Sequence, residues 1–535
     1  MGIKGIRTAL KVDLDKPARE QLGLHNRWHP EVPAVGKIAN NEVVKIECLD
    51  WTGGQIGNND SADDLRNVDL TQIHYLSGPF DIETAEPGDV LLVEIQDVQP
   101  FEDQPWGYSG VFHKENGGGF LDQIYPETAK AIWDFEGIFC SSRHIPHVRF
   151  AGLIHPGILG CAPSAEILAE WNRREGELIA ANTVADQIVA QPPNPTNAHG
   201  GNAAGDVQSR IAKEGARTIP GRPENGGNCD IKNLSRGSKI YLPVHVPGAK
   251  FSVGDLHFSQ GDGEVSFCGG IEMSGVITLK FTVIKNGVAK LDMKSPIFHA
   301  GPVEPQFGSG RYLTFEGFSV DEHGKQHFLD TTVAYRQACL RVIEYLRRYG
   351  YSDYQIYILL SCAPVQGHIA GIVDIPNTCT TLSVPMDIFD FDIRPEADVV
   401  KKEMANCAFE SKKQSGALWV GAQKGVGGTR LLSLLLSLLL SPSVGATRRK
   451  GRPATPRRGL SPLQRPPVAE VSTVEPGMQR LRLSMLKQGR GHKSPGGSGI
   501  DDGVRLWRVS KSPKKPGGKS PASKTVAREV SPGGD

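Results

Sequence analysis

Apolar and polar residues alternate in short segments along the first 285 residues, and turns separate the segments. The clearest segment is 275–286, in which every second position from Ile277 to Val283 is apolar. Shorter apolar runs occupy 90–95 and 239–244. Alternation with a period of two is typical of a strand that buries one face. The pattern therefore predicts strands at these three places.

Two segments carry the longer period of a helix. One begins after Ser164, which can cap it, and continues through Trp171. The other covers 330–349 and ends before Gly350, a residue that commonly stops helices. Its apolar stripe, at spacings of four, three and four, consists of Tyr335, Cys339, Val342 and Leu346. We expect these two helices within a chain of strands.

Two other segments add to this outline. The apolar run 354–360 has the composition of a strand, and 181–217 is rich in Asn, Gly and Pro, which predicts an exposed excursion from the core. The chain has 62 Gly and 37 Pro but only 7% aromatic residues, which indicates many turns. Together the patterns predict a mainly β, β-sandwich-like fold with a few α-helices and some α+β character.

Charge divides the chain into two parts. The 535 residues carry 60 Lys and Arg against 59 Asp and Glu, a net charge of +1. Residues 415–535 hold 22 of the basic and 6 of the acidic residues, a net charge of +16, which leaves −15 for residues 1–414. We therefore predict an acidic globular domain over 1–410 and a basic, low-complexity, disordered tail over 411–535.

The tail allows two interpretations. Lys-Ser-Pro occurs three times in it, and its charge would attract phosphates, so a regulatory or nucleic-acid-binding extension is one of them. The other is coding sequence foreign to the natural protein, such as intron read-through, and we favour this one. We expect no nucleic-acid partner, and a tail that catalysis does not need.

Cysteines and apolar runs indicate the compartment. The nine cysteines are scattered without a Cys-x-x-Cys pair, which predicts reduced and mostly buried thiols. Residues 1–7 lack the apolar segment of a secretory signal, and the longest apolar run, 431–440, is half the roughly 20 residues of a membrane span. These features predict a cytosolic protein without a membrane segment.

The densest polar constellation lies at 254–264. Asp255 and His257 are two residues apart and share one face of a strand, and Asp262 and Glu264 share a face of the next, so a hairpin would gather two carboxylates and an imidazole. Such a group suits a divalent metal, or a general base beside an orienting acid. A polar turn in which each Asp bonds its own backbone explains the same residues.

Other polar patches are weaker candidates. Asp230 follows the Gly-rich turn at 225–227 and is expected at the mouth of a strand. The acidic stretch 58–64 lacks the pattern of a calcium loop, so we expect a solvated turn there. His144 and His147 are separated by a proline that prevents a shared helical face, which favours structural roles.

Five motifs in order resemble the acetamidase/formamidase family, and its fungal formamidase branch in particular. They are Tyr75-Leu-Ser-Gly-Pro-Phe80, Ala85-Glu-Pro-Gly-Asp89, His155-Pro-Gly-Ile-Leu-Gly-Cys-Ala-Pro163, Gly226-Gly-Asn-Cys-Asp230 and the constellation at 254–264. The resemblance runs from about residue 5 to 410. It implies a mainly β, homo-oligomeric, cytosolic amidohydrolase that converts formamide into formate and ammonia.

The resemblance also implies a metal in the site, with zinc as the first candidate. We expect Asp230, His257 and Glu264 to be the metal ligands, and Asp255, Glu264 and Asp262 to be the catalytic acids or bases. An acetamidase or small-lactam amidohydrolase on the same fold is the main alternative. A non-catalytic binding protein is another, although all five polar side chains are present.

Overall fold

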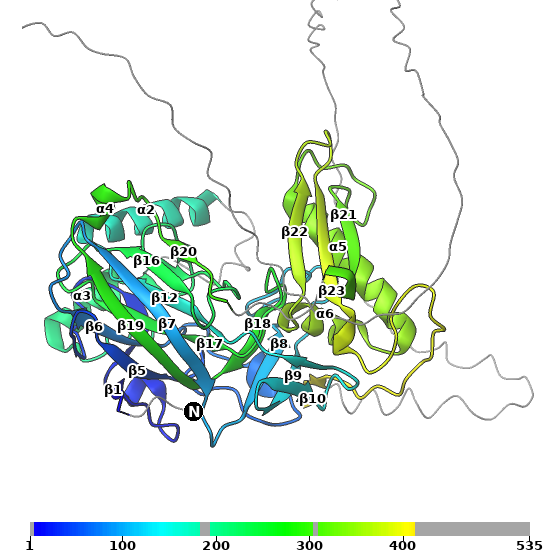
Figure 1. The fold of residues 1–535 in the computed structure, drawn as a ribbon, viewed down its shortest axis with the longest axis horizontal. Helices are drawn as coiled ribbons and strands as arrows, with labels where there is room; N and C mark the ends of the chain where they lie inside the picture. The colour runs from blue at the N-terminus through cyan, green and yellow to red at the C-terminus, as the bar shows by residue number, and fades with distance from the viewer. Residues whose placement is uncertain (1–4, 182–192, 303–308, 412–535) are drawn as a thin grey trace, which may run out of the picture. The chain divides into compact units, whose positions relative to one another are not determined.

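The structure is a computed structural model of the chain, and it describes residues 5–181, 193–302 and 309–411. These residues belong to the first of two compact units, Met1–Leu431. Apart from Ser411, the predicted disordered tail lies outside the described residues. Strands dominate the described part, which confirms the predicted mainly β fold (Figure 1).

The first sheet has six strands and contains all three strands predicted from alternation. Their order is β1 (Arg7–Leu10), β5 (Val43–Cys48), β19 (Gly275–Ile284), β7 (Val90–Pro100), β16 (Lys239–Pro243) and β20 (Ile297–His299). In β19 the side chains of Ile277, Leu279 and Phe281 are fully buried, as the alternation predicts. Strand β7 runs antiparallel beside β19 along nearly its whole length.

The second sheet is larger and carries the polar constellation at its centre. Its main path is β11 (Arg149–Ala151), β10 (Phe139–Ser142), β9 (Ala129–Glu136), β8 (Trp106–Val111), β18 (Phe267–Met273), β17 (Phe251–His257), β12 (His155–Cys161), β15 (Gly226–Asn228) and β14 (Gly221–Arg222). Strand β6 (Leu76–Ile82) also pairs with β17, β2 (Leu24–His25) and β4 (Gly36–Ile38) pair with β6, and β24 (Ala408–Phe409) pairs with β9. Every residue of β17 is buried.

The two sheets pack face to face around one core. Phe251 of β17 and Phe281 of β19 meet edge to face, with ring centroids 5.0 Å apart. Both belong to a single cluster of buried apolar side chains that also takes in α5 and α6. This is the sandwich-like arrangement expected from the sequence, and burial of such a cluster is the main force that stabilises it.

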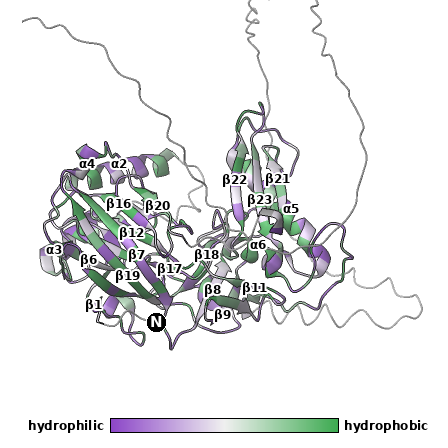
Figure 2. Cartoon of the chain, in the orientation of Figure 1, coloured by the Kyte–Doolittle hydropathy of each residue, from purple (hydrophilic) through white to green (hydrophobic). Residues whose placement is uncertain are grey.

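Helices cover the outer side of the sheets. The predicted helix after Ser164 is α2 (Ala165–Ala181), and it packs through Leu168 and Trp171, while its other residues give it the mixed colours of Figure 2. The interpretation of 181–217 as an exposed excursion is wrong for its second half. Helix α3 (Gly205–Glu214) and β13 (Ala216–Arg217), which pairs with β3 (Arg27–Trp28), lie there, and Ala216 is buried. Short helical turns occur at α1 (Asp63–Arg66), α4 (Gly287–Lys290) and η1 (Ala18–Glu20).

A three-stranded sheet with one helix against it forms the last part of the described chain. Its order is β21 (Tyr312–Phe318), β23 (Cys379–Pro385) and β22 (Gln366–Gly371). The predicted helix at 330–349 is α5 (Thr331–Leu346), capped by the Asp330 side chain and followed by η4 (Arg347–Tyr349). It lies beside these strands in Figure 1. The turns η3 (Ser309–Arg311) and η5 (Met386–Ile388) flank the sheet.

The strand predicted at 354–360 is wrong, because this segment is the helix α6 (Asp353–Cys362). Eight of its ten residues are buried, so the helix is apolar all round and shows no helical period. The capping box formed by Ser352 and Gln355 marks its start and is the signal that identifies it.

The cysteines agree with a further expectation, that of reduced and mostly buried thiols. All nine cysteines are free, and seven of them are buried. Among the described residues no helix is long and apolar enough to cross a membrane.

Candidate active site

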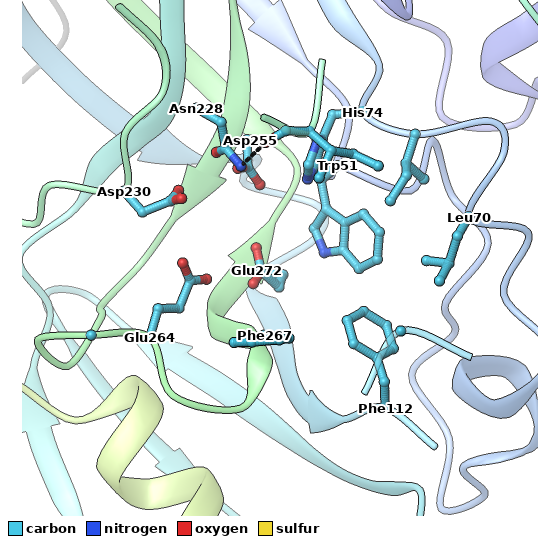
Figure 3. A pocket seen from close by; sticks show the side chains of 14 residues that line it. Trp51, Leu70, His74, Phe112, Asn228, Asp230, Asp255, Glu264, Phe267 and Glu272 are labelled. Carbon is cyan, nitrogen blue, oxygen red and sulfur yellow. Dashed lines mark hydrogen bonds between the residues drawn. The ribbon is translucent and has the colours of Figure 1, made fainter. Parts of the chain in front are cut away.

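A cavity of about 410 Å³ opens beside β17, and its two sides differ in chemistry. One side carries Asp230, Asp255, Glu264 and Glu272, and the other is mainly aromatic and aliphatic (Figure 3). The cavity is lined by Trp51, Leu70, Ile73, His74, Phe112, Gly117, Ile219, Asn228, Asp230, Asp255, Gly263, Glu264, Phe267 and Glu272.

The acidic side is built around the imidazole of His257. Its Nε2 lies 2.9 Å from Glu272 Oε2, 3.3 Å from Asp255 Oδ1 and 3.9 Å from Glu264 Oε1. Donor atoms of Asp230, His257 and Glu264 all lie within 4.8 Å of one another. Those of Asp255, His257 and Glu272 do so as well. One imidazole thus connects two overlapping groups of carboxylates.

Separate elements bring these side chains together. Asp255 and His257 lie on β17, and Glu272 lies opposite His257 on the neighbouring strand β18. Glu264 comes from the loop between these strands, and Asp230 follows β15 by two residues. The antiparallel pairing of β17 and β18 therefore places three of the five side chains directly.

Three of the carboxylates stand on backbone in the left-handed region. The φ angles are 46° at Asp230, 57° at Asp255 and 41° at Glu264. Such a conformation costs a residue other than glycine about 1–3 kcal/mol and is concentrated at functional sites. Val253 and Leu256 both belong to the core, so the alternation of β17 shifts by one residue at Asp255. The shift turns Asp255 toward the cavity beside His257.

Two glycines provide the space that the crowded site side chains occupy. A Cβ on Gly157 would stand 2.6 Å from both Asp230 Oδ1 and Asp255 Oδ2. A Cβ on Gly270 would stand within 3.0 Å of the His257 ring. These distances are shorter than real Cβ contacts, so a side chain at either position would displace the site residues. Steric crowding thus explains why position 157 in the His155-Pro-Gly157 motif is a glycine.

Hydrogen bonds orient the His257 ring. Its Nδ1 lies 3.1 Å from Gln260 Oε1, and the amide of Gln260 is fixed because its Nε2 donates to the Asp230 carbonyl at 2.6 Å. An amide oxygen only accepts, so Nδ1 carries the hydrogen and Nε2 faces the carboxylates. In the neutral ring the Nε2 lone pair is then directed to the acidic side, where an electrophile can replace a proton on it.

The site is strongly perturbed in its protonation. Burial raises the pKa of Glu272 to about 8 and that of Glu264 to about 6. Burial, and then the charge of Glu264, raise the pKa of Asp230 well above its usual value. Burial also opposes the ionised form of Asp255, but the charge and hydrogen bond of His257, together with smaller contributions from His74 and His155, outweigh it and lower the pKa of that carboxyl.

His257 itself has a raised pKa. Burial disfavours its charged form, but the charges of Glu272 and Asp255 dominate. Four carboxyl groups therefore lie within the influence of the charge on His257.

The residues present fit a divalent metal ion. Asp230 Oδ1 is buried and has no hydrogen-bond partner among the described residues. Glu272 Oε2 is close to His257 Nε2 but is not directed toward it as a hydrogen bond requires. Carboxylate oxygens and an imidazole nitrogen are the ligands that such ions take in proteins. A cation among these side chains would satisfy the unpaired oxygens and offset the repulsion.

The structure brings together four of the five predicted site residues: Asp230, Asp255, His257 and Glu264. It does not bring Asp262 there. Asp262 Oδ1 lies 2.7 Å from Lys232 Nζ, and Oδ2 accepts from Gly367 N at 2.9 Å. The expectation that Asp262 and Glu264 share a strand is wrong, because β18 begins only at Phe267.

Glu272 is the site residue that the sequence analysis missed. It lies between Ile271 and Met273 within a buried strand, and a charged residue in such a position is the available signal. Trp51 and His74 on the apolar side were missed too, because they lie far upstream in the chain.

The remaining polar patches have structural contacts. His144 Nδ1 accepts from Ile132 N at 3.1 Å, and His147 pairs with Asp390 at 2.8 Å, as expected for structural histidines. In the acidic stretch 58–64, Asp64 is more than a solvated turn residue, because it pairs with the buried Lys130.

Comparison with known proteins places this site in a family. The sequence profile of the acetamidase/formamidase family matches residues 11–391. The chain belongs to this family. A Schizosaccharomyces pombe (strain 972) protein with the provisional name formamidase is 70% identical over 404 residues, which are 75% of this chain and 98% of that protein. These matches confirm the family, and the resemblance to fungal formamidases, that the five motifs predict.

Other members of the acetamidase/formamidase family carry several names. The formamidase of Methylophilus methylotrophus is 55% identical over 394 residues, 74% of this chain and 96% of that protein. The acetamidase of Mycolicibacterium smegmatis is 50% identical over 370 residues, 67% of this chain and 90% of that protein. The solved structure of a γ-lactamase from Delftia acidovorans has 52% identity and a TM-score of 0.73, and covers 76% of this chain and 100% of its own.

Proposed function

We propose that this protein is a formamidase, which hydrolyses formamide to formate and ammonia. The identities of 70% and 55% to proteins named formamidase support the substrate. The observation that carries the proposal is the group of buried carboxylates around His257, since hydrolysis of an amide requires an activated water and a proton for the leaving nitrogen.

We further propose that a divalent metal ion, with zinc as the first candidate, is bound by Asp230, His257 and Glu264. When bound, such an ion lowers the pKa of water and polarises a carbonyl. Gln260 holds His257 in the tautomer that exposes Nε2 to the ion. Two observations support this choice of ligands. Asp230 Oδ1 has no hydrogen-bond partner among the described residues, and the ligand atoms of the three side chains lie within 4.8 Å of one another.

Asp255 is the best placed side chain to hold a proton during the reaction. It is buried, its pKa is lowered by His257 despite that burial, and it faces the cavity. It therefore stays ionised and can accept a proton from the attacking water and return it to the nitrogen. Glu272, on the same side, is a second candidate for this role. The catalytic role expected for Asp262 stays a prediction, and its contacts favour an anchoring role.

The names of the relatives also suggest a second class of substrate, acetamide or a small lactam. The cavity of about 410 Å³ is far larger than formamide, so its size alone does not reject acetamide or a γ-lactam. An acetamidase and a γ-lactamase are 50% and 52% identical to this chain. A small-lactam amidohydrolase or an acetamidase is therefore the alternative.

Steady-state assays on purified protein separate these activities. Ammonia release is measured with formamide and acetamide, and the ring-opened amino acid is measured with γ-butyrolactam. We expect kcat/KM to be highest for formamide. A higher value for acetamide or the lactam would replace the proposed substrate, and binding without turnover of any of the three would indicate a non-catalytic binding protein.

Residues 1–410 form the catalytic domain in this proposal, and the protein acts as a cytosolic homo-oligomer without a nucleic-acid partner. The described part of the chain already contains every proposed site residue. Truncation after Glu410 should therefore leave kcat, KM and the oligomer size unchanged, which sedimentation and kinetics can test. A loss of activity or assembly would make 411–535 an integral part of the enzyme.

A further inference from the structure

The apolar side of the cavity contains two polar atoms without hydrogen-bond partners. Trp51 Nε1 and His74 Nδ1 are buried, and neither bonds to any described residue. The side chains are only 4% and 9% exposed. A buried donor or acceptor left unpaired costs about 1–3 kcal/mol, so two such atoms in one wall require an explanation.

Both side chains are held in place by their surroundings. The Trp51 and His74 rings lie against each other with centroids 5.4 Å apart. The backbone N–H of His74 donates to Thr218 Oγ1 at 2.6 Å, and that hydroxyl donates to the His74 carbonyl at 3.0 Å. Arg217 fixes the same segment through the Leu70 carbonyl at 2.5 Å. The wall is therefore preorganised before any substrate arrives.

The two rings can donate hydrogen bonds, whereas the carboxylates on the opposite side accept them. An indole N–H only donates, and a neutral imidazole also presents one N–H. Burial lowers the pKa of His74 to about 4, so its ring is neutral at physiological pH. The carboxylates across the cavity accept hydrogen bonds instead. Figure 3 shows Trp51 and His74 on the side of the cavity that faces Asp255 and Glu272.

Asn228 adds a third unpaired atom at the edge of the acidic side. Its Nδ2 donates to the Ile219 carbonyl at 2.9 Å, the bond that is dashed in Figure 3, and this contact fixes the orientation of the amide. Its Oδ1 is buried and has no partner in the described part of the chain. The acidic side therefore also carries an unpaired amide oxygen, which can only accept a hydrogen bond.

We propose that Trp51 and His74 are catalytic residues whose N–H groups bind the carbonyl oxygen of the amide substrate and stabilise the oxyanion, while Asn228 Oδ1 accepts an N–H of its nitrogen. The pattern of donors on one side and an acceptor on the other matches the two ends of an amide. This assignment rests on the proposed amide hydrolysis. It orients the carbonyl carbon toward Asp255, where water is activated.

The reaction balances with these groups. Water adds to the carbonyl carbon, its proton passes to Asp255, and the C=O π pair moves onto the oxygen held by the two N–H groups. When that pair returns, the C–N bond breaks and the nitrogen takes the proton from Asp255. Formic acid and ammonia result, and they exchange a proton to give formate and ammonium.

Substitutions that remove only the donors test the proposal. Trp51→Phe keeps an aromatic ring but removes the N–H, and His74→Phe does the same for the imidazole. Loss of one oxyanion donor typically lowers kcat about 10²–10³-fold, and we expect such a decrease with formamide while KM changes little. Bound metal by elemental analysis and the melting temperature should stay close to those of the unmodified protein.

Two control variants separate the loss of a hydrogen-bond donor from a change in the shape of the side chain. His74→Gln restores an N–H donor and should recover part of the lost kcat. Trp106→Phe removes an indole from a partly buried site that does not line the cavity, and should leave kcat unchanged. If a His74 variant fails to fold, Trp51→Phe decides the question alone.

Three results would overturn the assignment. They are a kcat within twofold of the unmodified protein in both Phe variants, an equal loss in His74→Gln and His74→Phe, and loss of bound metal on substitution of either ring. An unmodified protein that turns over none of the three amides would instead reject the proposed function, and this inference with it.

Discussion

Two regions of this molecule bury charge, and they do so in opposite ways. Lys130 is fully buried, and its ammonium lies 2.7 Å from Asp64 Oδ2 and also bonds Asn59 Oδ1 and the Gly57 carbonyl. The site around His257 gathers four carboxyl groups, of which Asp255 and Glu272 are buried, and leaves Asp230 Oδ1 without a partner among the described residues. The first region is complete within the chain, and the second is not.

The difference shows how structural and functional charges can be told apart. A structural ion pair must satisfy every donor, because desolvation of each charge is expensive. The cluster at His257 instead has raised pKa values, unpaired oxygen and three residues with positive φ, all of which cost stability. A chain keeps such costs where a ligand offsets them.

The largest expected effect comes from removal of the residue at the centre of the incomplete region. His257→Ala should lose the bound metal and lower kcat/KM for formamide by about 10³–10⁴-fold, since a metal supplies several kcal/mol of charge stabilisation. Elemental analysis and ammonia release measure the two losses. His323→Ala, on an exposed loop, is the matched control and should change neither.

Full activity in a chelated, metal-free sample would contradict the role of the metal. The carboxylates would then act as an acid and base pair without an ion.

The complete region should respond in stability and not in chemistry. Lys130→Met keeps the length of the side chain but leaves Asp64 uncompensated, so the free energy of unfolding should fall by about 3–5 kcal/mol. Denaturant titration measures this change. Folded protein should retain its metal content and kcat, and a selective loss of either would show that Lys130 serves the site.

The ion pair of Lys232 and Asp262 combines features of both regions, because it is a structural pair that holds a loop of the site. Lys232 Nζ bonds the Val365 carbonyl at 2.6 Å and Asp262 at 2.7 Å, and Asp262 also accepts from Gly367 N. These contacts anchor the loop that carries Glu264. Asp262→Asn should therefore lower metal affinity about 10–100-fold, as loss of an outer contact of a metal site does. Competition with a chelator measures this affinity.

The activity of this variant tests the predicted role of Asp262 in catalysis. With saturating metal, an anchoring residue allows kcat to recover. A kcat that stays low under metal saturation would support the catalytic role and contradict the anchoring one.

The sequence predicts three strands of the first sheet from their apolar patterns, and α2 and α5 because their helical period is clear. It predicts Asp255 and His257 because they share one strand. It fails for α6, whose uniform burial removes the helical period. It also fails for Glu272, since only the register of β17 against β18 brings that side chain to His257. Long-range pairing of this kind leaves no local trace in the chain.

The smallest expected effect is a pH dependence that distinguishes the two regions. In metal-free protein the pKa of Glu272 is raised by burial to about 8, against an ordinary value of 4.5. Between these values the unfolded chain releases a proton that the folded chain retains, so stability falls as pH rises through this window. The lowered pKa of Asp255 acts only below 3.8 and does not enter this range.

A bound metal displaces the protons that its ligands Asp230 and His257 retain, and its charge favours the ionised form of Glu272 beside them, so it should stabilise the protein more at pH 8 than at pH 6. If one proton is displaced, the melting temperature shift on metal addition should differ by about 3 °C between the two pH values. Differential scanning calorimetry with and without zinc measures it. Glu272→Gln cannot titrate at that position and should reduce the difference without abolishing it, because Asp230 and His257 keep raised pKa values, whereas Lys130→Met should preserve the difference in full. A shift that is equal at both pH values, or larger at pH 6, would mean that metal binding displaces no proton from this cluster, and that its carboxyl groups are already ionised in the folded chain.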